Sequence, residues 1–405
     1  MECCFLAATW MAAGKGTEKE NKMWAELKYS LEALHLGRFP DVDSQGQQFE
    51  PGSWRETTAG KVLAPCGQSD AEGSWTCVWI ALKADLEWLA NSLKMNHYGS
   101  ENPCGLCGCN RDPADKPWNH FSSRASWIHS IYTKDEFQQR YSACHPLFEF
   151  PGMLPQTVAI DLLHVCDHNG VAGSVAGSIM YEAIREKELG NSNLESGVQI
   201  LNEKIKEYYT TSGVQSHLPR LTLQNLIDTL NPLNSFPDLR GKAIKAANTR
   251  NIMPFVEMLA AELRDGSEYK DRRHKCVQSL VRFYDTVYDS GIYMSIDQSE
   301  AMASAIKRCC KHYTWLAKRS THLGLMRWPI RPKMHYWYHL TLRKQFLNPR
   351  FLQTYANESM VGKTCNIYKS ALSGSQNERR KVQHSVLAKY LTGLTVTFAG
   401  NASSD

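Results

Sequence analysis

The segment from Val158 to His164 constrains the fold of this chain more than any other. Val158 and Ile160 alternate in the way that a half-buried strand requires. Asp161 falls where this strand ends, and His164 follows three residues later. A carboxylate at the end of a core strand is held rigidly, and its oxygens suit hard divalent cations. The segment therefore predicts one corner of a nuclease-like metal site, and the partner acids must come from elsewhere in the chain.

The composition is that of a globular protein. Of the 405 residues, 42% are hydrophobic and 21% are charged, so the chain is long enough for one large core or several ordinary ones. No apolar run approaches the roughly 18 residues that a membrane span requires, and the N-terminal residues lack the basic leader of a signal peptide. Thirteen cysteines without regular spacing indicate reduced thiols in a cytosolic or nuclear protein.

The net charge of +5 conceals a strong asymmetry. Between residues 301 and 390 there are 17 lysines and arginines and only two acids, Glu358 and Glu378. The rest of the chain is therefore net acidic. This distribution favours a polyanionic partner for the C-terminal part, most simply nucleic acid. The alternative is a solvated basic face that lies against an acidic neighbouring domain.

Hydrophobic spacing divides the chain into five parts. Apolar residues recur at helical spacing through most of residues 172–320, whereas the flanking segments mix strand-like, aromatic and turn-rich stretches. The predicted parts are a helical lead-in (1–70), a first core segment with a Cys-rich loop (71–171), a helical block (172–320), a core-completing segment (321–395) and a loose tail (396–405). Gly170, Gly173 and Gly177 do not fit the dinucleotide fingerprint, so we assign them to close helix packing.

Two further acids are candidates to join Asp161. Asp85 closes a second predicted strand, residues 74–85, and Glu358 lies beyond the helical block in a basic, acid-poor setting. Adjacent strands would bring the two aspartates together, and a glutamate from a later helix could complete a site for Mg²⁺ or Mn²⁺. The alternative interpretations are a helix-capping role for Asp85 and a surface position for Glu358.

A second group of residues has the spacing of a zinc site. Cys104 and Cys107 form a Cys-x-x-Cys pair in a Gly- and Pro-rich turn, which is the usual thiolate half of a tetrahedral site. His335 and His339 are four residues apart, so on a helix they share one face and could complete it. Competing ligands are Cys109, Cys144 and His145. The alternative is a set of buried thiols, with the histidines on an aromatic core face.

A basic and aromatic stretch follows the helical block. Alternating cations and rings suit phosphate contacts and base stacking. Trp337 and Tyr338 are more often core residues, and the surrounding cations are the better candidates for DNA contacts. These candidates are Arg327, Arg331, Lys333, Arg343, Lys344 and Arg350.

The order of these motifs resembles that of eukaryotic cut-and-paste DDE/DDD transposases, most closely the CACTA and Plavaka-type branch. The order runs from the strand acid Asp85 through Cys104-x-x-Cys107 and Asp161-x-x-His164 to His335-x-x-x-His339 and Glu358, over roughly residues 75 to 370. The resemblance implies an α/β fold, with an RNase H-like mixed sheet core interrupted by a large all-helical insertion.

The resemblance also implies a function. Asp85, Asp161 and Glu358 would form the metal-binding triad, with His164 beside the scissile phosphate or behind the triad, and Glu182 is the main rival for the third acid. In the best-known relative with such a Cys and His pairing the Cys pair follows the second acid, whereas here it precedes it. We expect a nuclear protein that cleaves DNA strands and transfers them, and that holds a structural zinc ion. We expect no membrane partner, and the protein could form a homo-oligomer. The rival expectation is a catalytically inactive descendant that binds DNA or protein.

Overall fold

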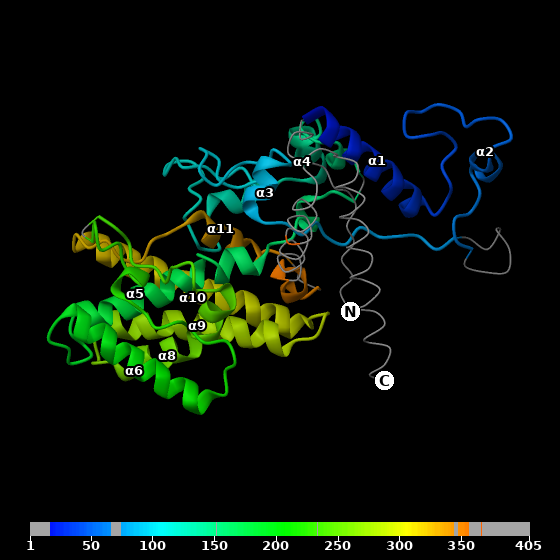
Figure 1. Ribbon diagram of the computed structural model, residues 1–405. Coiled ribbons are helices and arrows are strands. Elements are labelled where there is room, and N and C mark those ends of the chain that lie inside the picture. The colour runs from blue at the N-terminus through cyan, green and yellow to red at the C-terminus, as the bar shows by residue number, and fades with distance from the viewer. Residues whose placement is uncertain are drawn as a thin grey trace, which may run out of the picture. The chain divides into compact units, whose positions relative to one another are not determined.

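The computed structural model describes residues 17–65, 74–150, 152–232, 234–343, 347–355 and 366 (Figure 1). Within these ranges the protein is helical. The α-helices are α1 (Thr17–Leu36), α2 (Trp54–Thr58), α3 (Leu86–Asn91), α4 (Lys134–Tyr141), α5 (Val171–Arg185), α6 (Leu194–Ser212), α7 (Ala246–Asn251), α8 (Met253–Glu262), α9 (Glu268–Asp289), α10 (Ile296–His322) and α11 (Pro332–His339). The short helical turns are η3 (Ser126–Ser130), η4 (Pro146–Glu149), η5 (Pro155–Thr157), η6 (Leu163–Asp167), η7 (Leu223–Asn225) and η8 (Pro349–Leu352).

The chain divides into two compact units. The first takes in residues 1–80, 142–153 and 354–405, and the second takes in residues 81–141 and 154–353. In the first unit α1 packs on η4, where the rings of Trp24 and His145 lie 5.2 Å apart and Lys28 pairs with Glu149. The helical block and the Cys-rich loop both belong to the second unit.

Helices α9 and α10 form the largest helix pair of the second unit (Figure 1). Serine side chains cap both N-termini, Ser267 on α9 and Ser295 on α10, which satisfies backbone N–H groups that the first turn leaves free. Each helix buries an apolar stripe at intervals of three and four residues. The stripes are Cys276, Val277, Leu280, Phe283, Tyr284 and Val287 on α9, and Met302, Ala305, Ile306, Cys309, Cys310, Tyr313 and Leu316 on α10.

Helix α5 is buried around its circumference because two glycines admit neighbouring backbone. A Cβ added to Gly177 would lie 2.4 Å from Cα of Asp238, and the Gly173 carbonyl accepts a hydrogen bond from the Leu239 amide. This is the close helix packing that the sequence favours for these glycines.

The predicted RNase H-like mixed sheet is wrong. Strand pairing in the part of the chain that the structure describes is limited to isolated bridges, one of which joins Leu82 to Val158 in parallel. Both strand-like segments turn three residues after the bridge. Asp85 caps α3, and the Asp161 carboxylate accepts a hydrogen bond from the Leu163 amide, where η6 begins. The two acids that we interpreted as strand ends are therefore the residues that turn the chain into helix.

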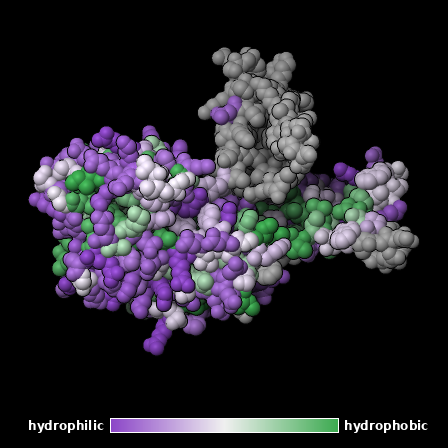
Figure 2. All heavy atoms as spheres, turned by 90° about the horizontal axis from the view of Figure 1, so that it is seen from below, coloured by the Kyte–Doolittle hydropathy of each residue, from purple (hydrophilic) through white to green (hydrophobic). Residues whose placement is uncertain are grey.

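No helix among the described residues is both long enough and apolar enough to cross a bilayer. Hydrophilic residues dominate the face of the helical body at the left of Figure 2, with hydrophobic residues scattered among them.

Candidate metal centre

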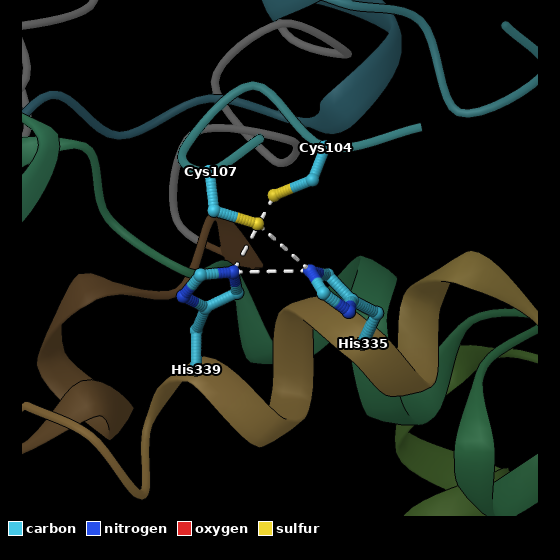
Figure 3. Close-up of side chains that lie close together, drawn as sticks. All are labelled: Cys104, Cys107, His335 and His339. Atoms are coloured by element: carbon cyan, nitrogen blue, oxygen red, sulfur yellow. Dashed lines mark hydrogen bonds between the residues drawn. The ribbon is translucent and has the colours of Figure 1, made fainter. Parts of the chain in front are cut away.

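Helix α11 presents two histidines from one face. Pro332 occupies its first turn, where the missing N–H costs nothing. His335 and His339 are one helical turn apart and are 1% and 2% exposed, so both rings point into the protein. Figure 3 shows the two imidazoles directed toward the thiols of Cys104 and Cys107, which come from the irregular loop above the helix.

The Cys-rich loop is held against α11 by its own backbone. The Gly105 amide donates a hydrogen bond to the Tyr336 hydroxyl (2.8 Å), and Cys107 forms an antiparallel bridge with Ile131. Gly105 also lacks space for a side chain, because an added Cβ would lie 2.6 Å from Cε of Met95. The loop is therefore fixed on both sides of the two thiols.

The four ligand atoms have the spacing of a tetrahedral zinc site. The His335 and His339 Nε2 atoms lie 3.1 Å apart, Cys104 Sγ lies 3.4 Å from His339 Nε2, and Cys107 Sγ lies 3.3 Å from His335 Nε2. Tetrahedral zinc with its usual bond lengths requires about 3.3 Å between two nitrogens and about 3.6 Å between nitrogen and sulfur. All four atoms lie within 4.8 Å of one another and all four residues are buried, so the cluster could hold a metal ion such as zinc.

The electrostatics of the cluster suit a thiolate-binding cation. Burial alone would raise the pKa of the Cys104 thiol, but hydrogen bonds from Cys107 and Cys109 and the nearby histidines bring it well below its ordinary value. Burial and the interaction with Cys104 raise the pKa of Cys107. Burial also lowers the pKa of His339, which favours the neutral imidazole that binds metals.

A further set of contacts orients the ligands. His335 Nδ1 lies 2.7 Å from the Trp118 carbonyl oxygen, so this nitrogen carries the proton and Nε2 is left for a metal. The Trp127 ring lies 4.2 Å from the His335 ring. Sequence reasoning missed Trp118, Trp127 and Tyr336 as supports of this centre. The only local signal was the density of aromatic residues around the Cys and His motifs.

The competing ligands lie elsewhere or outside the four-atom cluster. Cys109 is buried beside Cys104 and Cys107 but is not one of the four. Cys144 is exposed, and His145 accepts a hydrogen bond from the Leu147 amide; both belong to the other compact unit.

The acid that opens the Asp161-x-x-His164 motif is buried. Asp161 is 3% exposed, and its Oδ2 lies 2.6 Å from Nδ1 of His164, whose side chain is 19% exposed. The two residues flank the start of η6, a π-helix (Leu163–Asp167). Single π-helical turns are rare and occur often at functional sites.

The other predicted acids have structural roles or lie outside the described residues. Asp85 is the N-cap of α3, and its Oδ1 accepts a hydrogen bond from the Trp88 amide at 2.5 Å. Glu358 lies outside the described residues. The rival Glu182 is fully buried in α5, where it pairs with Arg273 and accepts a hydrogen bond from Tyr269. No cluster of acids in the described ranges has the spacing of a magnesium or manganese site.

Several of the predicted DNA-binding cations are engaged within the fold. Arg327 pairs with Glu182 and Glu186, and Arg331 Nη1 lies 2.7 Å from Asp238 Oδ2. Arg350 donates a hydrogen bond to the Tyr288 carbonyl oxygen (2.9 Å). Lys344 lies outside the described residues.

Two cations connect the α11 segment to the Asp161 turn: Lys333 in the first turn of α11, and Arg343, which follows the helix. Lys333 Nζ donates a hydrogen bond to the His168 carbonyl oxygen (2.9 Å), and burial, followed by the charge of Arg331, lowers the pKa of Lys333 to about 8. Arg343 donates to the carbonyl oxygen of the bridge residue Val158 (2.9 Å). Burial lowers the pKa of Arg343 to about 10.

No protein-family model, curated protein or solved structure matches this chain.

Proposed function

We propose that this protein acts on DNA as a transposase-like enzyme that cleaves strands and transfers them, with Asp85, Asp161 and Glu358 as its acidic residues. The observation that carries the proposal is the parallel bridge between Leu82 and Val158. Each aspartate follows its bridge residue by three positions, so the two acids leave neighbouring backbone segments at equal distance from the bridge. The order of motifs along the chain supports the same conclusion.

The chemistry would use oxygen ligands. Carboxylates are the ligands that Mg²⁺ and Mn²⁺ prefer, and such ions activate the attacking oxygen and stabilise the leaving oxygen of a phosphodiester. Water is the first attacking group, and the freed 3′-hydroxyl is the second. His164 holds the Asp161 carboxylate through Oδ2, so its role is to orient this acid.

Zinc at Cys104, Cys107, His335 and His339 would have a structural role. Four protein ligands leave no open position for substrate, as is usual in structural zinc sites. The ion would fix α11 to the Cys-rich loop, and α11 in turn is tied to the Asp161 turn through Lys333.

A nicking assay tests the proposal. Supercoiled plasmid is incubated with Mg²⁺ or Mn²⁺ and with wild type, Asp85→Asn or Asp161→Asn. Asparagine keeps the hydrogen-bond acceptor that caps α3 or meets the Leu163 amide, so each variant removes the charge and retains the local structure. The control is Asp135→Asn, which neutralises an exposed acid. We expect the first two variants to lose nicking and the control to retain it. Equal cleavage by all four proteins would refute the mechanism.

A second candidate is a non-catalytic DNA- or protein-binding descendant. The specific observation in its favour is that Asp85 already serves as a helix cap, a purely structural use. If wild type binds DNA but neither Mg²⁺ nor Mn²⁺ produces nicks, this second function becomes the better account.

A further inference from the structure

A groove of about 810 Å³ lies between the N-terminal half of α10 and the turn at residues 341–343. One of its walls is cationic, formed by the exposed residues Lys307, Arg308 and Lys311. The Thr341 hydroxyl also lines the groove and has no hydrogen-bond partner among the described residues. The groove belongs entirely to the second compact unit.

The three cations have no ion-pair partner in the described ranges, in contrast to most cations of the neighbouring helix α9. On α9, Arg272 pairs with Glu268 and Lys275 pairs with Asp271, each one turn apart. Helix α10 has no acid between Glu300 and its end at His322. Its positive charge is therefore left to solvent or to a ligand.

Lys311 contributes to a pKa shift of His312, its neighbour on the helix. Burial is the first cause that lowers the pKa of His312 to about 4, and the charges of Arg272, Lys275 and Lys311 lower it further.

The cations extend beyond the groove as a stripe along α10. Lys307, Lys311 and Lys318 are separated by four and seven residues, so they share one face, and Arg308 and Arg319 flank this face; all five are exposed. From Lys307 to Lys318 the helix rises about 16 Å at 1.5 Å per residue. Phosphates on one DNA strand follow one another about every 3.4 Å along the duplex axis, so the stripe spans roughly five of them.

We propose that this stripe and groove bind the phosphate backbone of duplex DNA. An acidic protein segment fits less well, because a flexible chain does not hold its carboxylates at a fixed spacing, whereas duplex phosphates repeat regularly along cations spread over about 16 Å of helix. The inference rests on the proposed function only in that DNA is the partner, and it requires no cleavage. It places a DNA-contact surface on α10, outside the basic stretch that the sequence singled out.

Binding is measured by fluorescence anisotropy with labelled duplex DNA in EDTA over a series of salt concentrations. The test variant is Lys307→Gln/Arg308→Gln/Lys311→Gln. The matched control, Lys206→Gln/Lys242→Gln/Arg282→Gln, removes the same charge from exposed residues on other surfaces. Both are checked for wild-type circular dichroism and melting temperature.

Each phosphate contact contributes about 0.9 to the slope of log affinity against log salt. The test variant should therefore show a slope about 2.7 less steep than wild type. A roughly fourfold rise in salt should then reduce its affinity for DNA by a factor about 40 times smaller than the factor for wild type. The control should keep the wild-type slope. Equal slopes for test variant and wild type, or an equal drop in test and control, would overturn the proposal. So would competition by polyglutamate as effective as that by unlabelled duplex.

The assay separates this inference from the proposed function. A wild-type protein that binds through the stripe but never nicks DNA refutes cleavage alone. If Asp161→Asn loses nicking while the stripe variant binds DNA as wild type does, only the docking surface is refuted.

Discussion

Removal of the four-residue Cys/His cluster is the perturbation that most directly tests the architecture. The variant is Cys104→Ser/Cys107→Ser. Cys104 and His339 are 235 positions apart, and Cys107 and His335 are 228 apart, so a bound zinc ion closes a loop of that length. In the chain-entropy treatment of a cross-link, closing a loop of this size stabilises the fold by about 5 kcal/mol. For a unit of this size a change of about 5 kcal/mol corresponds to a fall in melting temperature of roughly 10 °C or more.

The assay combines metal analysis with thermal unfolding monitored by circular dichroism. Wild type is expected to retain about one zinc equivalent after dialysis and to melt at a lower temperature after chelation, because metal binding free energy is folding free energy. The double variant should contain no zinc and should not respond to added metal. Cys144→Ser, at an exposed cysteine, is the control, and Cys109→Ser tests the neighbouring thiol; both should keep the metal. Wild type without zinc and without a response to chelator would refute the reasoning.

Three other predictions concern the second compact unit. Arg273→Met leaves the buried Glu182 without its closest cation and should cost about 3–5 kcal/mol, whereas Arg264→Met at the surface should cost little. Because burial already raises the pKa of the Glu182 carboxyl, the folded variant takes up a proton more readily than the unfolded chain. Its stability in urea should therefore fall as the pH rises above the ordinary titration range of a glutamate carboxyl, and a flat pH profile would contradict this. Gly177→Ala should destabilise by about 1–3 kcal/mol, because the added Cβ meets the Asp238 backbone, whereas Gly291→Ala meets nothing within 4 Å and should be near neutral in thermal unfolding. In hydrogen exchange, Cys104→Ser/Cys107→Ser should accelerate amides 158–168, whose carbonyl groups are bound by Lys333 of α11 and by Arg343 after it. The amides of α6 serve as the internal reference, and unchanged exchange at 158–168 would show that the cluster and the turn are independent.

The metal cluster could be predicted because each half is a local pattern. Cys-x-x-Cys places two thiols in one turn, and two histidines four apart share one face of a helix. Each half offers two of four tetrahedral ligands, so each half needs a partner. Helices α5, α6, α8, α9 and α10 were predictable for a similar reason, because their apolar residues repeat at local intervals.

The sheet was mispredicted because an alternating apolar run followed by an acid is compatible with two structures, the end of a strand and the start of a helix. Val158 and Ile160 fit a strand, and Asp161 fits its end. The same acid also turns a chain into helix by accepting a backbone N–H, as Asp85 does for α3 and Asp161 does at Leu163. Which of the two structures forms depends on whether other strands are present to extend the Leu82–Val158 bridge. That depends on distant segments and cannot be inferred from the run itself.

Charge shows the same dependence on distant residues. The sequence places the strongest basic signal at residues 327–350, yet Arg327 and Arg331 there meet acids from α5 and from Asp238. Those acids lie far away in the sequence, so a local count of charges overstates the field of this stretch. Helix α10 contains no acid after Glu300, and no acid from another described segment pairs with its exposed lysines. The electrostatic field that a polyanion would encounter is set by the cations that folding leaves unpaired, and α10 gathers several of them along one helix.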